Sequence, residues 1–194
     1  MSQLAPMPQD GSTRGRPLLM DAQARDQLCQ AVRTLDAAER HGHPLPMSQA
    51  LVQVARCLAA LGALEDAESH LEQALRWSRA LATMDIAVEL MCECAETACA
   101  TADAADAEES RRGNAARERA RDHAFEAASM AAQVSDPQWE VKVLLRVSDV
   151  LDRCGDHDDA VSMQTRALLL MNLQPAGADT RGDALHCPSP QHLM

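Results

Sequence analysis

The sequence contains very few aromatic residues: of 194 residues none is Tyr, one is Phe and two are Trp. A mixed or all-β domain of this size would draw on many more aromatic side chains for its core. The apolar content is mostly Ala, Leu, Val, Met and Cys, and small, helix-forming residues let helices approach closely. We therefore predict an all-α protein with one domain of about 150 ordered residues. Its thin, Ala-rich core requires helices to stack along their length.

Positive charge is also scarce, since Lys142 is the only Lys and the formal net charge is −11. This balance argues against non-specific binding of nucleic acid or anionic membranes, and it leaves a basic protein partner open. The sequence has no run of apolar residues long enough to span a membrane. Its first ten residues lack the basic start and apolar run of a secretory leader. We expect a cytoplasmic protein.

Signatures of catalysis and of metal binding are missing as well. The seven cysteines are odd in number and suggest no disulfide framework. Cys92 and Cys94 lie about 200° apart on a helix, and no second Cys/His pair has the spacing of a structural zinc site. We predict that the cysteines are small buried apolar residues that bind no metal. Nucleophile motifs, phosphate-binding Gly-rich loops and calcium loops are absent, so we expect neither enzymatic activity nor a cofactor.

Seven amphipathic segments lie between two ends that are rich in Pro and Gly. We predict a disordered arm at residues 1–17 and a disordered tail at 174–194. Ser48 is a candidate cap of the second helix, and the fourth helix, apolar on two faces, should lie in the middle of the stack. Residues 102–113 form either a long exposed connection or extensions of the flanking helices. Apolar spacing predicts the helices, over about 18–40, 47–61, 64–81, 85–101, 114–134, 137–153 and 157–173.

A unit of helix, Gly turn and helix occurs twice. When Gly62 is aligned with Gly155, apolar or small residues coincide on both sides of the turn. A Gly permits a tight turn with positive φ, and small residues at matched positions permit close helix crossings. The coinciding pairs are Leu51 with Leu144, Val54 with Val147, Ala55 with Ser148, Leu58 with Leu151, Ala67 with Ala160 and Ala74 with Ala167.

The spacing of these positions resembles the 34-residue pattern of the tetratricopeptide repeat (TPR) family. Residues 48–81 match it well, and residues 141–174 match it with Gln164 in the place of Leu71. Residues 85–134 form a degenerate middle unit with Ala95 at its small position. The resemblance implies stacked antiparallel helix hairpins, a TPR-like α-solenoid of about seven helices.

In this family the first helix of each hairpin lines a concave groove that holds a peptide. The resemblance implies a protein- or peptide-binding adaptor or regulatory scaffold; a self-associating structural subunit, or an acidic chaperone of a secreted protein, is the alternative. Family members that clamp a C-terminal carboxylate need polar residues where Val52 and Ala59 stand, so an amphipathic helix or linear segment is the expected ligand. By position the groove residues are Gln49, Val52, Arg56 and Ala59 in the first unit and Lys142, Leu145, Asp149 and Arg153 in the last.

One local basic cluster precedes and enters the fifth predicted helix. No aromatic residues are interleaved with it to stack on bases. We predict a solvated face whose charges pair among themselves, with a docking site for an acidic partner as the alternative. The cluster comprises Arg111, Arg112, Arg117, Arg119 and Arg121, and the acids that dilute it are Glu108, Glu109, Glu118 and Asp122.

Overall fold

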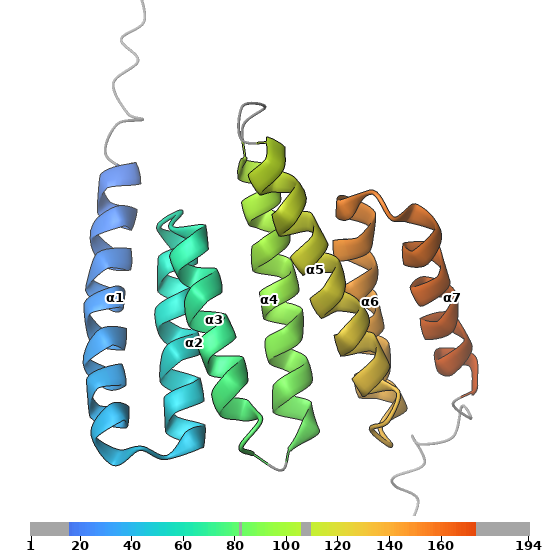
Figure 1. Cartoon of the computed structure of the whole chain (residues 1–194), viewed down its shortest axis with the longest axis horizontal. Helices are drawn as coiled ribbons and strands as arrows, with labels where there is room; N and C mark the ends of the chain where they lie inside the picture. The colour runs from blue at the N-terminus through green and yellow to red at the C-terminus, as the bar shows by residue number, and fades with distance from the viewer. Residues whose placement is uncertain (1–15, 82, 106–109, 174–194) are drawn as a thin grey trace, which may run out of the picture.

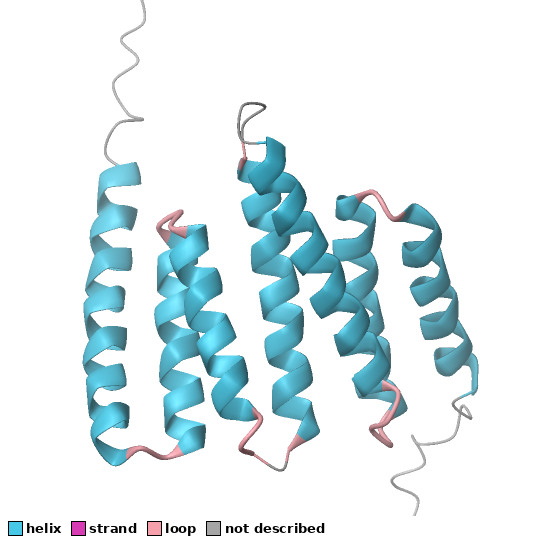
Figure 2. Cartoon of the chain, viewed as in Figure 1, coloured by secondary structure: helices cyan, strands magenta, loops and turns pink. Residues whose placement is uncertain are grey.

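Seven helices make up nearly all of the protein that the computed structural model describes, which is residues 16–81, 83–105 and 110–173. No strand occurs among these residues (Figure 2), so the prediction of an all-helical fold of about seven helices is confirmed. None of the described helices is long and apolar enough to cross a membrane. The helices are α1 (Arg16–His41), α2 (Pro44–Ala60), α3 (Leu64–Ser78), α4 (Met84–Ala104), α5 (Ser110–Ala131), α6 (Pro137–Cys154) and α7 (His157–Leu173).

The helices form a row of antiparallel hairpins. The most extensive contacts join α2 to α3, α4 to α5 and α6 to α7, which makes three hairpins. Neighbouring hairpins meet where α3 packs on α4, where α5 packs on α6, and where α4 touches α6 directly. α1 packs against α2 and forms one end of the row, while α7 forms the other end (Figure 1).

Both predicted glycine turns form, and they share one geometry. Gly62 has a φ of +80° and Gly155 a φ of +90°, a left-handed conformation that residues with a Cβ rarely adopt. In each turn the amide after the glycine donates to the carbonyl five residues earlier, over 3.0 Å and 2.9 Å. This is the bond of a Schellman cap. The alignment of the two hairpins is thus confirmed in the backbone.

The starts of α2 and α6 differ in how they are capped. Asp136 caps α6, because its Oδ1 accepts hydrogen bonds from the amides two and three residues later at 3.0 and 3.1 Å. α2 begins at Pro44, three residues before the predicted start, and His43 takes the cap position without a side-chain bond. The prediction that Ser48 caps this helix is wrong, since Ser48 lies within α2 and is 2% exposed.

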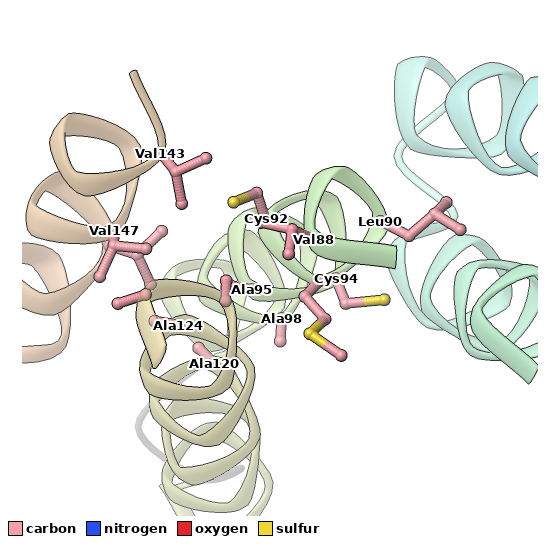
Figure 3. Packing of buried hydrophobic residues seen from close by; sticks show 14 of the residues in the cluster. Val88, Leu90, Cys92, Cys94, Ala95, Ala98, Ala120, Ala124, Val143 and Val147 are labelled. Carbon is pink, nitrogen blue, oxygen red and sulfur yellow. The ribbon is translucent and has the colours of Figure 1, made fainter. Parts of the chain in front are cut away.

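α4 lies in the middle of the row, as its two apolar faces predicted (Figure 1). Ala95 and Ala98 of α4 are no more than 1% exposed, and Figure 3 shows Ala120 and Ala124 of α5 beside them. Methyl side chains on both sides let α4 and α5 pack closely. The alanines of α5 that are 0% exposed are Ala116, Ala120, Ala124, Ala127 and Ala131.

Segment 102–113 is mostly helical. α4 and α5 extend into it from both sides, so the alternative of extended helices is confirmed; residues 106–109 lie outside the described part of the chain. Gly113 is buried in α5, and a Cβ on it would come within 3.2 Å of the Cβ of Ala105. This glycine therefore permits the close approach of the two helices near their connection.

The predicted arm and tail fall almost wholly outside the described residues, which exclude 1–15 and 174–194. α1 begins at Arg16, two residues before the predicted start of the first helix. The two predictions of disorder therefore stay predictions, except that Arg16 and Pro17 belong to a helix.

Candidate functional site

An open hollow lies between the first helices of the first two hairpins, α2 and α4, and has a volume of about 280 Å³. Val52, Ile86 and Leu90 contribute an apolar wall, and Trp139 of α6 completes the apolar part of the lining. A hollow of this kind can accommodate an apolar side chain of a ligand, with polar and charged residues of the protein around it. The other lining residues are polar or charged, namely Ser48, Gln49, Gln53, Arg56, Asp85, Glu89 and Glu93.

The first helices of the three hairpins share one register. α2, α4 and α6 begin at residues 44, 84 and 137, and their buried residues recur at the same distances from these starts. Ala95, 1% exposed, stands at the small position of α4 that corresponds to Ala55 and Ser148, as predicted. The equivalent positions along the groove side are Gln49, Glu89 and Lys142; Val52, Cys92 and Leu145; and Arg56, Glu96 and Asp149.

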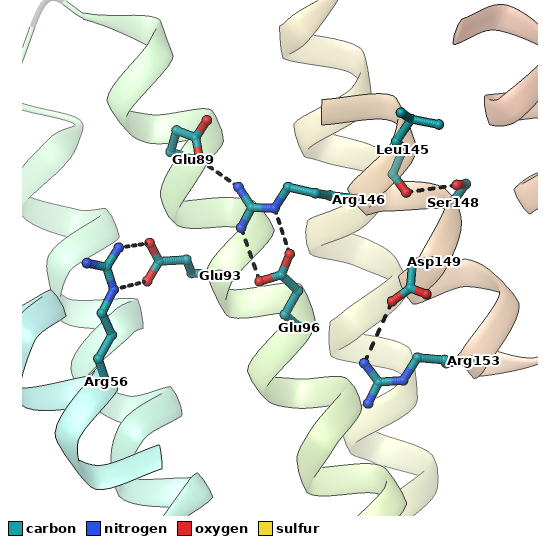
Figure 4. Close-up of polar contacts among 9 residues, drawn as sticks. All are labelled: Arg56, Glu89, Glu93, Glu96, Leu145, Arg146, Ser148, Asp149 and Arg153. Atoms are coloured by element: carbon teal, nitrogen blue, oxygen red, sulfur yellow. Dashed lines mark hydrogen bonds and ion pairs between the residues drawn. The ribbon is translucent and has the colours of Figure 1, made fainter. Parts of the chain in front are cut away.

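Acidic side chains form a row along α4. Asp85, Glu89, Glu93 and Glu96 follow at intervals of three or four residues, which places them on one face of the helix. Arg146 of α6 donates from Nε to Glu96 over 2.7 Å, from Nη2 to the same carboxylate over 3.1 Å, and from Nη1 to Glu89 over 2.6 Å (Figure 4). The hydrogen bond to Glu96 is the main cause that raises the pKa of Arg146. Arg146 thereby braces α6 against α4.

Two further arginines pair with acids of α4. Arg56 of α2 donates to the carboxylate of Glu93 from Nη2 over 2.5 Å and from Nε over 3.2 Å. Arg153 of α6 donates to Asp103 over 2.7 Å and lies 3.9 Å from Asp149. The hydrogen bonds to Glu93 and to Asp103 are the main causes that raise the pKa values of the two arginines. Arg56 therefore neutralises Glu93 through the Nε–Nη2 edge of its guanidinium.

The structure separates the predicted groove residues into two groups. Gln49, Val52 and Arg56 line the hollow together. The equivalent residues of the third hairpin are exposed on α6 and do not line it, although Trp139 at the start of α6 does. These residues are Lys142, Leu145 and Asp149.

The last two predicted residues lie apart from the hollow as well. Ala59 is half-buried and packs against the core. Arg153 turns toward the C-terminal end of α4, where Asp103 accepts its hydrogen bond. Neither residue is among those that line the hollow between α2 and α4.

Sequence reasoning missed the acidic row and the arginine opposite it. The signal for the row was present, since Asp85, Glu89, Glu93 and Glu96 recur at helical spacing on a segment that is otherwise apolar. The pairing with Arg146 had no such signal, because its partners lie 50 and 57 residues earlier in the chain.

The prediction that the basic cluster at the start of α5 pairs its charges among themselves is wrong for Arg112, Arg119 and Arg121, because their acid partners lie on other elements. Arg119 donates to Glu68 of α3 from Nε over 2.5 Å and from Nη2 over 3.1 Å. Arg121 pairs with Asp156 in the turn before α7, and Arg112 also pairs with an acid of α3. Packed helices supply these acids, so the pairs join neighbouring elements.

Four of the cysteines are buried as predicted, Cys57 is half-buried, and Cys29, on the end helix α1, is exposed, contrary to the prediction. Cys187 lies outside the described residues. Burial raises the pKa values of Cys92, Cys94 and Cys99 to about 12. Such thiols stay protonated at neutral pH. Within the described part of the chain, no three potential metal ligands lie together.

Comparison with known proteins identifies the fold. No known protein family matches the sequence, and no curated protein matches it significantly. The crystal structure of the de novo designed helical repeat protein DHR81 is similar with a TM-score of 0.51 and 16% identity, over 80% of this chain and 78% of that chain. The DHF58 filament has a TM-score of 0.46 and 21% identity over 81% and 93% of the two chains. The chain has a helical repeat fold.

Proposed function

We propose that this chain is a TPR-like adaptor that binds a segment of another protein in the hollow between α2 and α4. The observation that carries the proposal is the composition of the hollow: Val52, Ile86 and Leu90 form an apolar wall that opens to solvent between charged residues. Helical repeat stacks present such surfaces for binding. The glycine turns and the matched small residues support the TPR-like description.

The chemistry of the hollow selects an amphipathic, basic segment. An apolar side chain of the partner packs against Val52 and Ile86, beside the ring of Trp139. The charged pairs of the hollow already neutralise Arg56, Glu93 and Glu89 internally. Asp85 is exposed and forms no ion pair within the described residues, so it is the charge available to a partner, and it attracts a Lys or Arg.

The test selects peptides from a random library displayed on phage against the immobilised full chain. Binding of the selected peptides is then measured through Trp139 fluorescence, after Trp77→Phe has removed the other Trp of the sequence. Ile86→Lys places a charge in the apolar wall, and Asp85→Lys reverses the free charge. Val32→Lys is the matched control, because Val32 is an exposed apolar residue of α1 outside the hollow.

The proposal expects selected peptides that combine a large apolar residue with Lys or Arg. Ile86→Lys weakens their binding by at least about tenfold, and Asp85→Lys weakens it by about fivefold in low salt. Val32→Lys leaves it unchanged. Circular dichroism checks that each variant keeps its helical content. Peptides that bind the wild type and both hollow variants with equal affinity would refute the assignment of the site.

A further inference from the structure

The second helices of the three hairpins, α3, α5 and α7, share a register. Each position on α7 therefore has an equivalent position on α3 and on α5, and the exposure of the three can be compared. Alanines mark the register, since Ala67 of α3, Ala120 of α5 and Ala160 of α7 are each 2% exposed or less. In this register four positions of α3 and α5 are buried or half-buried, and α7 has the same four positions. They are Glu68, Leu71, Leu75 and Ser78 in α3; Arg121, Ala124, Ala128 and Ala131 in α5; and Val161, Gln164, Leu168 and Met171 in α7.

This face is buried or half-buried in α3 and α5, each of which has a following hairpin. All four positions of α3 are 5% exposed or less, and Glu68 is bound there by Arg119 of the next hairpin. The three alanines of α5 are 4% exposed or less. At the end of the row the face is open: Val161 is 59% exposed, Leu168 58% and Met171 54%. We call Val161, Leu168 and Met171 the terminal face.

The first helix of the last hairpin shows the same pattern at one position. Cys92 of α4 is 2% exposed and lies beside Val143 of α6 (Figure 3). Its equivalent in α6 is Leu145, which is 49% exposed and lies on the side of α6 away from α4 (Figure 4). No hairpin follows α6 and α7 within the described residues, so Leu145 adds to the apolar surface at this end of the stack.

We propose that the terminal face binds the terminal face of a second copy of this chain, as a two-fold symmetric dimer. Exposed large apolar side chains that gather on one face of a helix mark a site of interaction when they form a continuous patch. The other end of the stack does not match it, because Val32 is the one exposed large apolar residue among the described side chains of α1. The sequence after Leu173 is poor in apolar side chains for such a cover: it has three Pro and two Gly, and its large apolar residues are Leu185, Leu193 and Met194.

The charges of α7 permit antiparallel pairing with its copy. The acids Asp158 and Asp159 lie in the first turn, so a crossing midway between Val161 and Leu168 places each acidic end beside the C-terminal end of the other helix. At that end Asp158 and Asp159 meet no acidic side chain of the other α7, because the last turns of α7 carry none. The two Asp158 residues would be about 20 Å apart, well beyond the screening length of about 8 Å at physiological ionic strength. The helix dipoles also oppose each other favourably.

The expected dimer is weak, because two helix faces and Leu145 make a small interface. Stable dimers bury about 1,200–2,000 Å² in total, and smaller interfaces belong to transient pairs. We expect a dissociation constant of roughly 10–100 μM, which corresponds to about 5.5–7 kcal/mol. The dimer does not involve the hollow between α2 and α4, so it can form whether or not that hollow binds a peptide.

Sedimentation velocity of the full chain between 5 and 500 μM tests the proposal. Leu168→Glu and Val161→Glu each place an acid in the terminal face. Leu169→Glu is the matched control, because Leu169 is also 58% exposed but lies about 100° further around α7. We expect the dimer fraction of the wild type to rise with concentration. The two terminal-face variants should weaken the dimer at least tenfold, and the control should change it less than twofold.

Three results would overturn the proposal. The first is a wild type that stays monomeric at 500 μM. The second is equal weakening by Leu169→Glu, which would place the interface elsewhere. The third is dimerisation only after Leu185 and Leu193 are replaced by Ser in the full chain, which would show that the chain's own C-terminal residues, and not a second copy, cover the terminal face. Circular dichroism confirms that each variant is folded.

Discussion

Arg146 provides the most direct test of how the hairpins are held in register. Arg146→Met removes the guanidinium and keeps an apolar stem, so it deletes the three hydrogen bonds to Glu89 and Glu96 with little change in packing. Lys142→Met is the control, because Lys142 lies on the same helix one turn earlier, is exposed and forms no ion pair within the described residues.

The expected cost follows from the exposure of the partners. The side chain of Arg146 is 31% exposed and that of Glu96 is 40% exposed, so water screens these bonds and they contribute far less than fully buried ones. We expect a loss of about 1–2 kcal/mol in the free energy of unfolding. Glu89 and Glu96 lose their counter-charge while Glu93 stays paired with Arg56, and the like-charge repulsion along α4 adds a few tenths of a kcal/mol. For a domain of this size the melting temperature falls by roughly 3–6 °C.

Urea denaturation at two salt concentrations measures the effect. A double-mutant cycle with Glu96→Gln should give a coupling energy of about 1 kcal/mol, and 0.5 M NaCl should reduce it by about half. Lys142→Met should change stability by less than about 0.5 kcal/mol. A loss below 0.5 kcal/mol for Arg146→Met, with no coupling to Glu96, would refute the view that this arginine braces α4 and α6.

Three further predictions concern the turns, caps and core. Gly155→Ala should destabilise the protein by about 1–2 kcal/mol in urea melts, because φ is +90° although a Cβ would meet open space; an unchanged midpoint would contradict this reason. Asp136→Ala removes the cap of α6 and should cost about 1 kcal/mol in the same assay, and Asp136→Asn should largely retain it. Burial raises the pKa values of Cys92, Cys94 and Cys99 to about 12 from an ordinary value of 9.0. The unfolded chain releases these protons at lower pH than the folded chain, so the contribution of the three thiols to stability is constant below about pH 9 and is lost as the pH rises from 9 toward 12. Replacing the three thiols by Ala should remove that slope.

The sequence alone determined the elements and the repeat. The periodic apolar residues predicted seven helices, because a helix in a stack needs one covered apolar face. The near absence of aromatic residues argued against a mixed or all-β core. Gly62 and Gly155 fixed the turns, since only a left-handed residue closes such a cap without strain. Matched alanines fixed where helices cross. All of these are local or periodic properties, which a chain displays before it folds.

Only the tertiary structure decided which side chains meet. The partners of Arg119, Arg121 and Arg146 lie between 35 and 57 residues away, and their pairing depends on how far one helix is shifted and rotated against the next. The position of a hairpin in the row also decided whether equivalent residues are exposed. Cys92 is buried beneath α6, while its equivalent Leu145 is exposed because no described hairpin follows α6 and α7. The repeat pattern in the sequence does not predict this difference, because the burial of a residue depends on what packs against it as well as on the residue itself.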